Sequence, residues 1–262
     1  MPRSIWNGSI AFGLVNVPVR LYSATESKQV QFHQFEKGTK KRIEYRRVTT
    51  GTKHEVDYDD IVKGYEVSKG KYVTITPEEL ESVEPGRSRT LDIEDFVLLE
   101  EIDPVYFDKS YYLEPVDGAE KAYALLVEAM SETGRVAVGR FVMRTKQYLA
   151  TVRPMDDVLV LETMFFGDEV RDPKDLKVPT RVKVPPKEKR IATQLIESLT
   201  VPFDPHAYKD TYRSRVLGLI RRKAKGQEIE VKPREKAADV VDLMAALEAS
   251  LQERKKPKRK AS

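Results

Sequence analysis

Three aspartates that stand within four positions of one another, Asp57, Asp59 and Asp60, are the residues best suited to metal-assisted chemistry. Hard divalent cations bind clustered carboxylate oxygens, but this run lacks the glycine turn and the distant glutamate of a calcium-binding loop. Two interpretations stay open. The missing loop features favour an exposed acidic edge. The other interpretation is the metal site of a DNA-cleaving enzyme that also uses Glu66.

The other residue types that commonly perform catalysis are scattered. The three histidines, His33, His54 and His206, never stand at ligand spacing on one element. The sequence contains neither a phosphate-binding glycine loop nor a His-Glu-x-x-His pair. It also contains no cysteine, which excludes disulfides and thiolate zinc sites. These absences favour a protein that is not an enzyme, with no catalytic residue, no metal and no cofactor, while the metal-dependent nuclease stays open as the alternative.

Positive charge is distributed unevenly along the chain. The whole chain carries a net charge of +4, and residues 253–262 alone carry +5, so residues 1–252 carry −1. Within them, residues 92–108 hold seven acidic and no basic side chains, whereas residues 135–153 hold five basic and no acidic ones. Such separation lets one surface bind a polyanion while another repels it.

Many of the basic residues fall at alternate positions of predicted strands. Alternate residues of a strand point to the same face, so they can contact one phosphate backbone together. The clusters are Arg140, Arg144 and Lys146; Lys40, Arg42 and Arg46 with Lys37 and Lys41 in the preceding turn; and Arg181 with Lys183.

These clusters indicate contact with the phosphates of a nucleic acid. For any single cluster, an exposed basic face without a partner remains the alternative. No run of aromatic residues resembles a base-stacking platform, and no helix-turn-helix is evident. The pattern therefore favours phosphate contact that is independent of sequence and strongly dependent on salt. A general DNA-coating protein that binds through its basic tail is a further alternative.

Hydrophobic residues alternate along most of the first two-thirds of the chain, which is the period of half-buried strands. Near the N-terminus, Ile10 and Phe12 alternate in one phase and Val17, Val19 and Leu21 in the other, which predicts a bend or bulge at residues 13–15. The further predicted strands are residues 29–35, 42–48, 71–75, 90–94, 110–113, 135–144, 148–153 and 158–164.

Two helices are predicted among these strands. A capping box at residues 76–79 predicts a short helix. Residues 118–133 predict a longer one, which Asp117 can cap and Gly134 ends. Its expected apolar stripe consists of Ala122, Leu125, Leu126, Ala129 and Met130.

The last third of the chain is predicted to be helical. One helix begins near residue 187, and Asp204 followed by Pro205 predicts the start of a second, which Gly226 ends. A charged linker and a last helix, residues 234–253, precede a tail too polar to fold, residues 254–262. Because strands and helices do not alternate, a doubly wound sheet is excluded, and a barrel or closed sheet with a helical C-terminal extension is predicted.

Three long segments give the chain a specific resemblance. Residues 4–23 (SIWNGSIAFGLVNVPVRLYS), 56–66 (VDYDDIVKGYE) and 100–115 (EEIDPVYFDKSYYLEP) closely resemble the bacterial Ku family, and the likeness runs over about residues 2–225. Members of that family are homodimers that bind DNA ends in non-homologous end joining. The resemblance implies a mixed, β-rich fold, in which a β-barrel core with an inserted helix and bridging strands precedes a helical C-terminal arm.

The resemblance also implies a domain plan and a mechanism. Residues 1–186 would form the barrel core and the bridge around DNA, residues 187–225 a dimerisation arm, residues 226–253 a linker and a ligase-recruiting helix, and residues 254–262 a disordered basic tail. Two subunits would form a ring onto which only a double-stranded DNA end can thread. Such a protein acts in the cytoplasm at the nucleoid and does not associate with a membrane.

Site residues follow from the resemblance one by one. The three basic clusters above would line the DNA channel. The last helix would recruit the multi-domain bacterial DNA ligase D through its apolar stripe, which includes Val240, Met244, Leu247 and Leu251. The tail would strengthen DNA binding through Arg254, Lys255, Lys256, Lys258, Arg259 and Lys260.

Overall fold

The computed structural model describes residues 3–83, 89–179, 182–227 and 243–255. The chain divides into two compact units. The first consists of Met1–Lys28 and His33–Asp175, and the second of Gln29–Phe32 and Leu176–Ser262. Among the described helices, none is both long and apolar enough to cross a bilayer.

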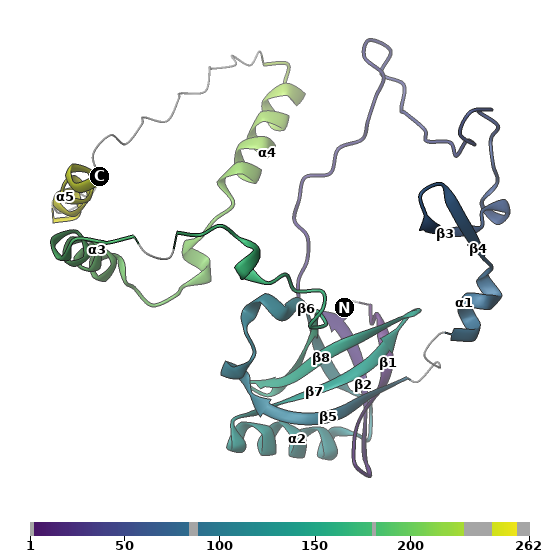
Figure 1. Ribbon diagram of the computed structural model, residues 1–262, viewed down its shortest axis with the longest axis horizontal. Coiled ribbons are helices and arrows are strands. Elements are labelled where there is room, and N and C mark those ends of the chain that lie inside the picture. Colours follow the sequence, from purple (N-terminus) through teal and green to yellow (C-terminus); the bar gives the residue numbers. More distant parts are fainter. Residues whose placement is uncertain (1–2, 84–88, 180–181, 228–242, 256–262) are drawn as a thin grey trace. The chain divides into compact units, whose positions relative to one another are not determined.

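A closed β-barrel forms the centre of the first unit (Figure 1). Its strands are β1 (Trp6–Phe12), β2 (Val15–Ser23), β5 (Thr90–Leu98), β6 (Phe107–Pro115), β7 (Arg135–Met143), β8 (Lys146–Met155) and β9 (Val158–Met164). They follow the order β1-β2-β6-β9-β8-β7-β5, and a parallel pairing of β1 with β5 closes the barrel. The predicted fold class, a β-barrel core with an inserted helix and a helical C-terminal region, is confirmed.

The change of phase near the N-terminus is a hairpin turn. Phe12 pairs with Val15, so Gly13 and Leu14 form a tight turn, and Gly13 adopts a φ of 57° that suits a residue without Cβ. Pro18 lies beyond the end of the β2–β6 ladder, where its missing N–H costs no sheet hydrogen bond.

The helix α2 (Glu120–Thr133) packs against the barrel and ends at Gly134, which has a φ of 63°. The predicted apolar stripe is wrong in part. Leu125 is exposed, whereas Tyr123 and Val127 are buried with Leu126 and Met130. The N-cap is Ala119, with no side-chain cap, rather than the predicted Asp117.

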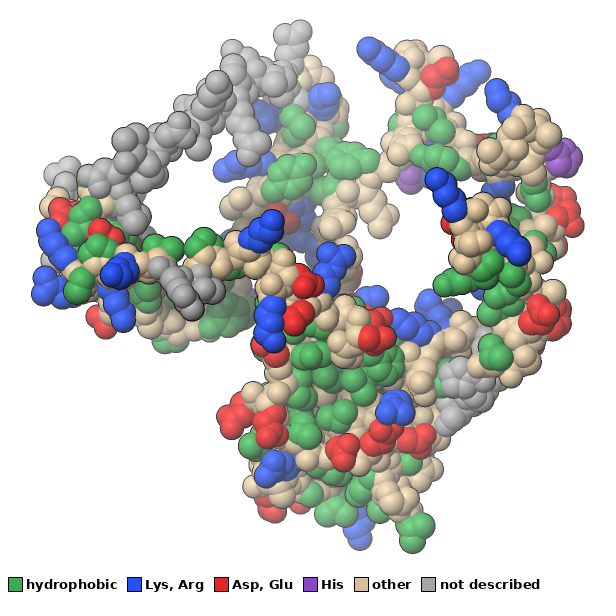
Figure 2. Space-filling view, viewed as in Figure 1, with side chains coloured by type: hydrophobic (Ala, Val, Ile, Leu, Met, Phe, Trp, Pro, Cys, Tyr) green, Lys and Arg blue, Asp and Glu red, His purple; other side chains and the backbone are tan. Residues whose placement is uncertain are grey.

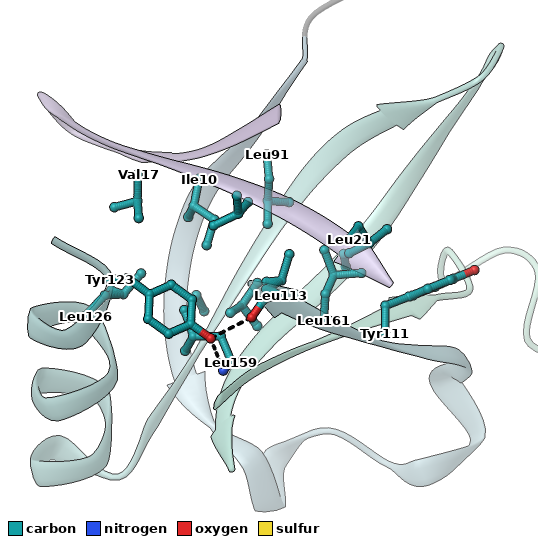
Figure 3. Close-up of a cluster of buried hydrophobic side chains, with 14 of the residues drawn as sticks. Ile10, Val17, Leu21, Leu91, Tyr111, Leu113, Tyr123, Leu126, Leu159 and Leu161 are labelled. Atoms are coloured by element: carbon teal, nitrogen blue, oxygen red, sulfur yellow. Dashed lines mark hydrogen bonds between the residues drawn. The ribbon is translucent and has the colours of Figure 1, made fainter. Parts of the chain in front are cut away.

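Tyr123 joins α2 to the barrel core. Its hydroxyl donates to the Leu113 carbonyl oxygen and accepts from the Leu159 amide, each at 2.7 Å (Figure 3). Leu113 and Leu159 are register partners on β6 and β9. The apolar interior around them includes Ile10, Leu21 and Leu161, which are fully buried.

The stretch between β2 and β5 contains less regular structure than predicted. The expected strands at residues 29–35 and 42–48 are absent, and only isolated bridges join Phe35 to Arg42 and Val48 to Glu55. The strand predicted at residues 71–75 is β4 (Lys71–Ile75), and its antiparallel partner is β3 (Lys63–Ser68).

The predicted capping box forms at the start of α1 (Pro77–Val83). The Glu79 amide donates to the Thr76 hydroxyl at 3.2 Å, and the Thr76 amide donates to the Glu79 carboxylate at 2.9 Å. Residues three apart therefore satisfy each other's backbone donors, as the sequence spacing predicts.

The second unit contains the helices α3 (Pro186–Leu199), α4 (Thr211–Ala224) and α5 (Leu243–Lys255). The predicted start of the second helix is wrong. Asp204 caps only a 3-10 turn at Pro205–Ala207, and α4 begins at Thr211 with the Asp210 side chain accepting from the Arg213 amide at 2.8 Å. The linker predicted after Gly226 falls largely outside the described residues.

Candidate nucleic-acid interface

The first basic cluster lies at one end of the barrel, around the hairpin turn between β7 and β8. Met143 pairs with Lys146, so Arg144 and Thr145 form the turn, and Arg144 adopts a φ of 62°. The cluster lies on a strand and its turn, as the sequence predicts, but the predicted shared strand face is wrong, because Arg144 lies in the turn and Lys146 begins β8. Arg144 and Lys146 are nevertheless exposed neighbours in space, and the Lys146 ammonium lies 5.2 Å from the Tyr148 ring centroid.

A cavity of about 320 Å³ opens beside this turn. Residues 4–7 line it together with Val142, Arg144 and Arg89. The indole of Trp6 donates to the Val142 carbonyl oxygen at 3.0 Å, which holds the N-terminal strand against the end of β7. In the described part of the chain, no acidic residue forms an ion pair with Arg89 or Arg144. Two arginines at one cavity, with no acidic partner among the described residues, suit an anionic group such as a phosphate.

Arg89 is a candidate that the sequence reasoning missed. It directly precedes β5, and its carbonyl oxygen accepts from the Ser9 amide at 2.8 Å. A Cβ on Gly8 would lie 2.1 Å from that oxygen, so only glycine permits this approach. The parallel pairing of β1 with β5 brings Arg89 to the cavity, and no local sequence signal reports such a pairing.

Arg140 is less available than the sequence suggests. Its guanidinium lies 3.3 Å from the Glu94 carboxylate, and both side chains are about half exposed. Exposed ion pairs of this kind contribute only about 0–1 kcal/mol. Glu94 therefore neutralises Arg140 without holding it strongly, and a polyanion would compete with this carboxylate.

The second basic cluster forms a loop rather than a strand. A bridge between Phe35 and Arg42 closes the loop, and the Glu36 amide donates to the Lys41 carbonyl oxygen at 2.9 Å. Lys37 and Lys40 lie in the exposed loop, and Lys40 has a φ of 55°. The predicted strand alternation is absent here, although the lysines still gather at one loop.

The arginines of that cluster have local partners. The Arg42 guanidinium lies 2.8 Å from the His33 Nδ1 atom, and Arg46 forms an ion pair with Glu55 at 3.1 Å. Figure 2 shows Lys and Arg side chains along the stretch between β2 and β5, and many Asp and Glu side chains over the barrel. In the third cluster, Lys183 is exposed, and Arg181 lies outside the described residues.

The acidic run that could suggest metal chemistry lies around a 3-10 turn at Tyr58–Asp60. All three aspartates are exposed. In the part of the chain that the structure describes, no three His, Asp or Glu side chains are arranged to hold a metal ion. The arrangement here is that of an exposed acidic edge.

The last helix, α5, packs against α3 within the second unit (Figure 1). An ion pair of 3.7 Å joins Lys187 to Glu248, and Met244, Leu247 and Leu251 are half-buried. The helix extends to Lys255, two residues into the predicted tail. The remaining predicted residues, Val240, Lys256, Lys258, Arg259 and Lys260, and the side chains of Arg254 and Lys255, lie outside the described part.

Comparison with known proteins assigns this chain to a family. A family model described as the Ku70/Ku80 beta-barrel domain matches residues 11–193. That span contains most of the barrel, the lysine loop and the cavity arginines.

Relatives match almost the whole chain. The non-homologous end joining protein Ku of Anaeromyxobacter sp. (strain K) is 48% identical over 96% of this chain and 86% of its own length. The protein of the same name from Symbiobacterium thermophilum is 47% identical over 95% of this chain, which spans 62% of that protein. Non-homologous end joining protein Ku 1 of Saccharopolyspora erythraea is 48% identical over 96% of this chain and 78% of its length. These matches confirm the resemblance seen in the sequence, and the chain belongs to the Ku family.

Proposed function

We propose that this chain binds the ends of double-stranded DNA, independently of sequence, in non-homologous end joining. The observation that carries the proposal is the identity of 47–48% with proteins named for that process, over 95–96% of the chain. The chain would act in the cytoplasm at the nucleoid, and it would position DNA rather than cleave it.

The charge arrangement supports contact with phosphates rather than bases. Arg89 and Arg144 flank a cavity without acidic partners among the described residues, and Lys37 and Lys40 lie in an exposed loop. Such contacts carry no sequence information, so affinity would be similar for all duplexes and would fall steeply with salt.

Preference for ends requires a topological device, since a broken duplex differs from an intact one chiefly in having a terminus. We propose a homodimeric ring, because two-fold closure joins two identical basic surfaces around one hole. Residues 187–225, which include α4 and all of α3 except Pro186, would form the arm that holds the partner subunit. Exposed apolar side chains on α4, among them Tyr212 and Ile220, support this role.

Gel-shift titration of linear and covalently closed circular DNA tests the ring, with molecular mass measured by light scattering. A dimeric ring shifts linear DNA, leaves circles free, and stays on linear DNA whose ends are blocked after loading. A protein that coats DNA binds circles and linear molecules alike. A monomer, or equal affinity for both topologies, would refute the ring.

The last helix carries a separate proposal, the recruitment of the bacterial DNA ligase D. Met244, Leu247 and Leu251 lie half-buried where α5 meets α3, so the ligase would have to displace α5 or bind its outer face. Deleting residues 234–262 should leave dimerisation and end loading intact and remove stimulation of the ligase. Loss of the dimer would instead assign the helix to the subunit core.

A further inference from the structure

A groove of about 750 Å³ lies on the barrel, at the opposite end of β8 from the Arg144 turn, where the first turn of α2 meets the ends of β6 and β9. Its walls are largely apolar and aromatic. Tyr112, Met155 and Val158 line it, and each of these residues is between 37% and 39% exposed. An open apolar groove of this size is typical of a binding site.

The floor of the groove is held rigidly by Tyr123. Its hydroxyl bridges the Leu113 carbonyl oxygen and the Leu159 amide at 2.7 Å each, at the last register pair of β6 with β9 (Figure 3). The buried aromatic ring and the two backbone bonds keep the groove from collapsing. A ligand would therefore find the site already formed and would lose little free energy to ordering it.

The charged residues that line the groove are all acidic. Glu114, Glu120 and Asp157 line it, and no Lys or Arg does. Hydrogen bonds from the Glu120 and Gly118 amides lower the pKa of the Glu120 carboxyl, so this group stays ionised well below neutral pH. Among the residues that the structure describes, the one ion pair at the rim joins Arg20 to Glu114 at 3.8 Å. The rim repels a polyanion such as DNA and attracts a cationic ligand.

We infer that the groove binds a peptide segment of a partner protein, in which an aromatic or aliphatic anchor stands beside Lys or Arg. The anchor would pack on Tyr112, Met155 and Val158, and the cations would pair with the carboxylates of the rim. A second copy of this chain fits poorly, because a two-fold contact would face the acidic rim with itself. The chain's own residues 254–262 match the charge but contain no large apolar anchor.

Selection from a phage library of random dodecamers tests the inference, with the full-length chain as bait and Met155→Arg as the counter-selected variant. The recovered peptides should carry Lys or Arg next to an aromatic or aliphatic residue. Synthetic copies, measured by fluorescence anisotropy, should bind Met155→Arg at least about tenfold more weakly. They should bind Asp157→Asn about threefold more weakly, and Asp168→Asn, which removes an exposed carboxylate outside the groove, equally well.

Val158→Arg serves as a second blocking variant if Met155→Arg melts at a lower temperature than the wild type. Three results would overturn the inference: no peptide that distinguishes the wild type from the blocking variants, recovery of acidic peptides, or binding only after residues 254–262 are removed. The last result would assign the groove to the chain's own tail. DNA affinity is measured in parallel, and none of these outcomes requires it to change.

Discussion

Glu94 reaches Arg140 because it is the extra residue of a β-bulge. Ile93 pairs with Gly139 and Asp95 pairs with Val138, so Glu94 has no register partner of its own. Bulges commonly re-aim a side chain, and here the carboxylate lies 3.3 Å from the Arg140 guanidinium. In a barrel proposed to bind DNA, the Glu94 carboxylate would compete with a phosphate for Arg140, which is one of the candidate phosphate contacts.

Glu94→Gln should therefore strengthen DNA binding. Removing the carboxylate frees Arg140, so affinity at low salt should rise and the slope of log K against log salt should steepen by about one unit. Stability should change by less than about 1 kcal/mol, since the pair is half exposed. Glu128→Gln on the exposed side of α2 removes the same charge elsewhere. Equal effects of the two variants would show that only net charge matters.

Arg89→Ala combined with Arg144→Ala should weaken binding at every sequence. If each guanidinium contacts one phosphate, the salt slope should flatten by about two units, because each contact releases about 0.9 counterions. Gel shifts at several salt concentrations measure this slope, and Lys121→Ala on α2 is the charge control. An unchanged slope in a variant that still binds would show that the cavity faces away from DNA.

Gly8→Ala should disturb the same cavity through the backbone. The new methyl would lie 2.1 Å from the Arg89 carbonyl oxygen, so β1 and β5 must separate. Such overpacking costs about 1–3 kcal/mol of unfolding free energy, and the displaced Arg89 should also weaken DNA binding. At Gly167 an added Cβ meets nothing within 4 Å, so Gly167→Ala is the matched control. Urea denaturation compares the two variants.

Hydrophobic alternation with a period of two predicted the strands correctly where neighbouring strands are present to pair with them. Ile10, Val17 and Leu21 alternate with less buried residues and are themselves fully buried in the barrel. The same period failed at residues 29–48, where no partner strand completes a sheet and every side chain but one is exposed. Hydrophobic alternation indicates that a segment can form a strand. Whether the strand forms depends on pairing with segments that are distant in the sequence.

The candidate site was predictable in its charges but not in its geometry. Arg144 was found from the spacing of clustered basic residues, yet the turn that directs it depends on the β7–β8 register. Arg89 was missed because it reaches the cavity through the pairing of β1 with β5, two strands that are far apart in sequence. Glu94 neutralises Arg140 only because a bulge re-aims it, which residue types alone do not reveal.

Tyr123→Phe should destabilise the barrel by about 1–3 kcal/mol at pH 7, because it leaves the buried Leu113 carbonyl and Leu159 amide without their bridging hydroxyl. Tyr65→Phe, at an exposed position, should change stability little. Chemical denaturation measures both. An equal effect of the two variants would mean that the groove floor does not depend on the bridge.

The difference between wild type and Tyr123→Phe should also depend on pH. Burial, the larger influence, raises the pKa of Tyr123 above its ordinary value of 10.0, although the bond from the Leu159 amide opposes this. The unfolded chain then loses this proton at lower pH than the folded one, so the stability due to neutral Tyr123 is complete below pH 10 and is lost as pH rises through the folded pKa. The wild type should therefore lose more stability than the variant between neutral and strongly alkaline pH. A gap between the two proteins that stays constant past pH 10 would contradict the raised pKa.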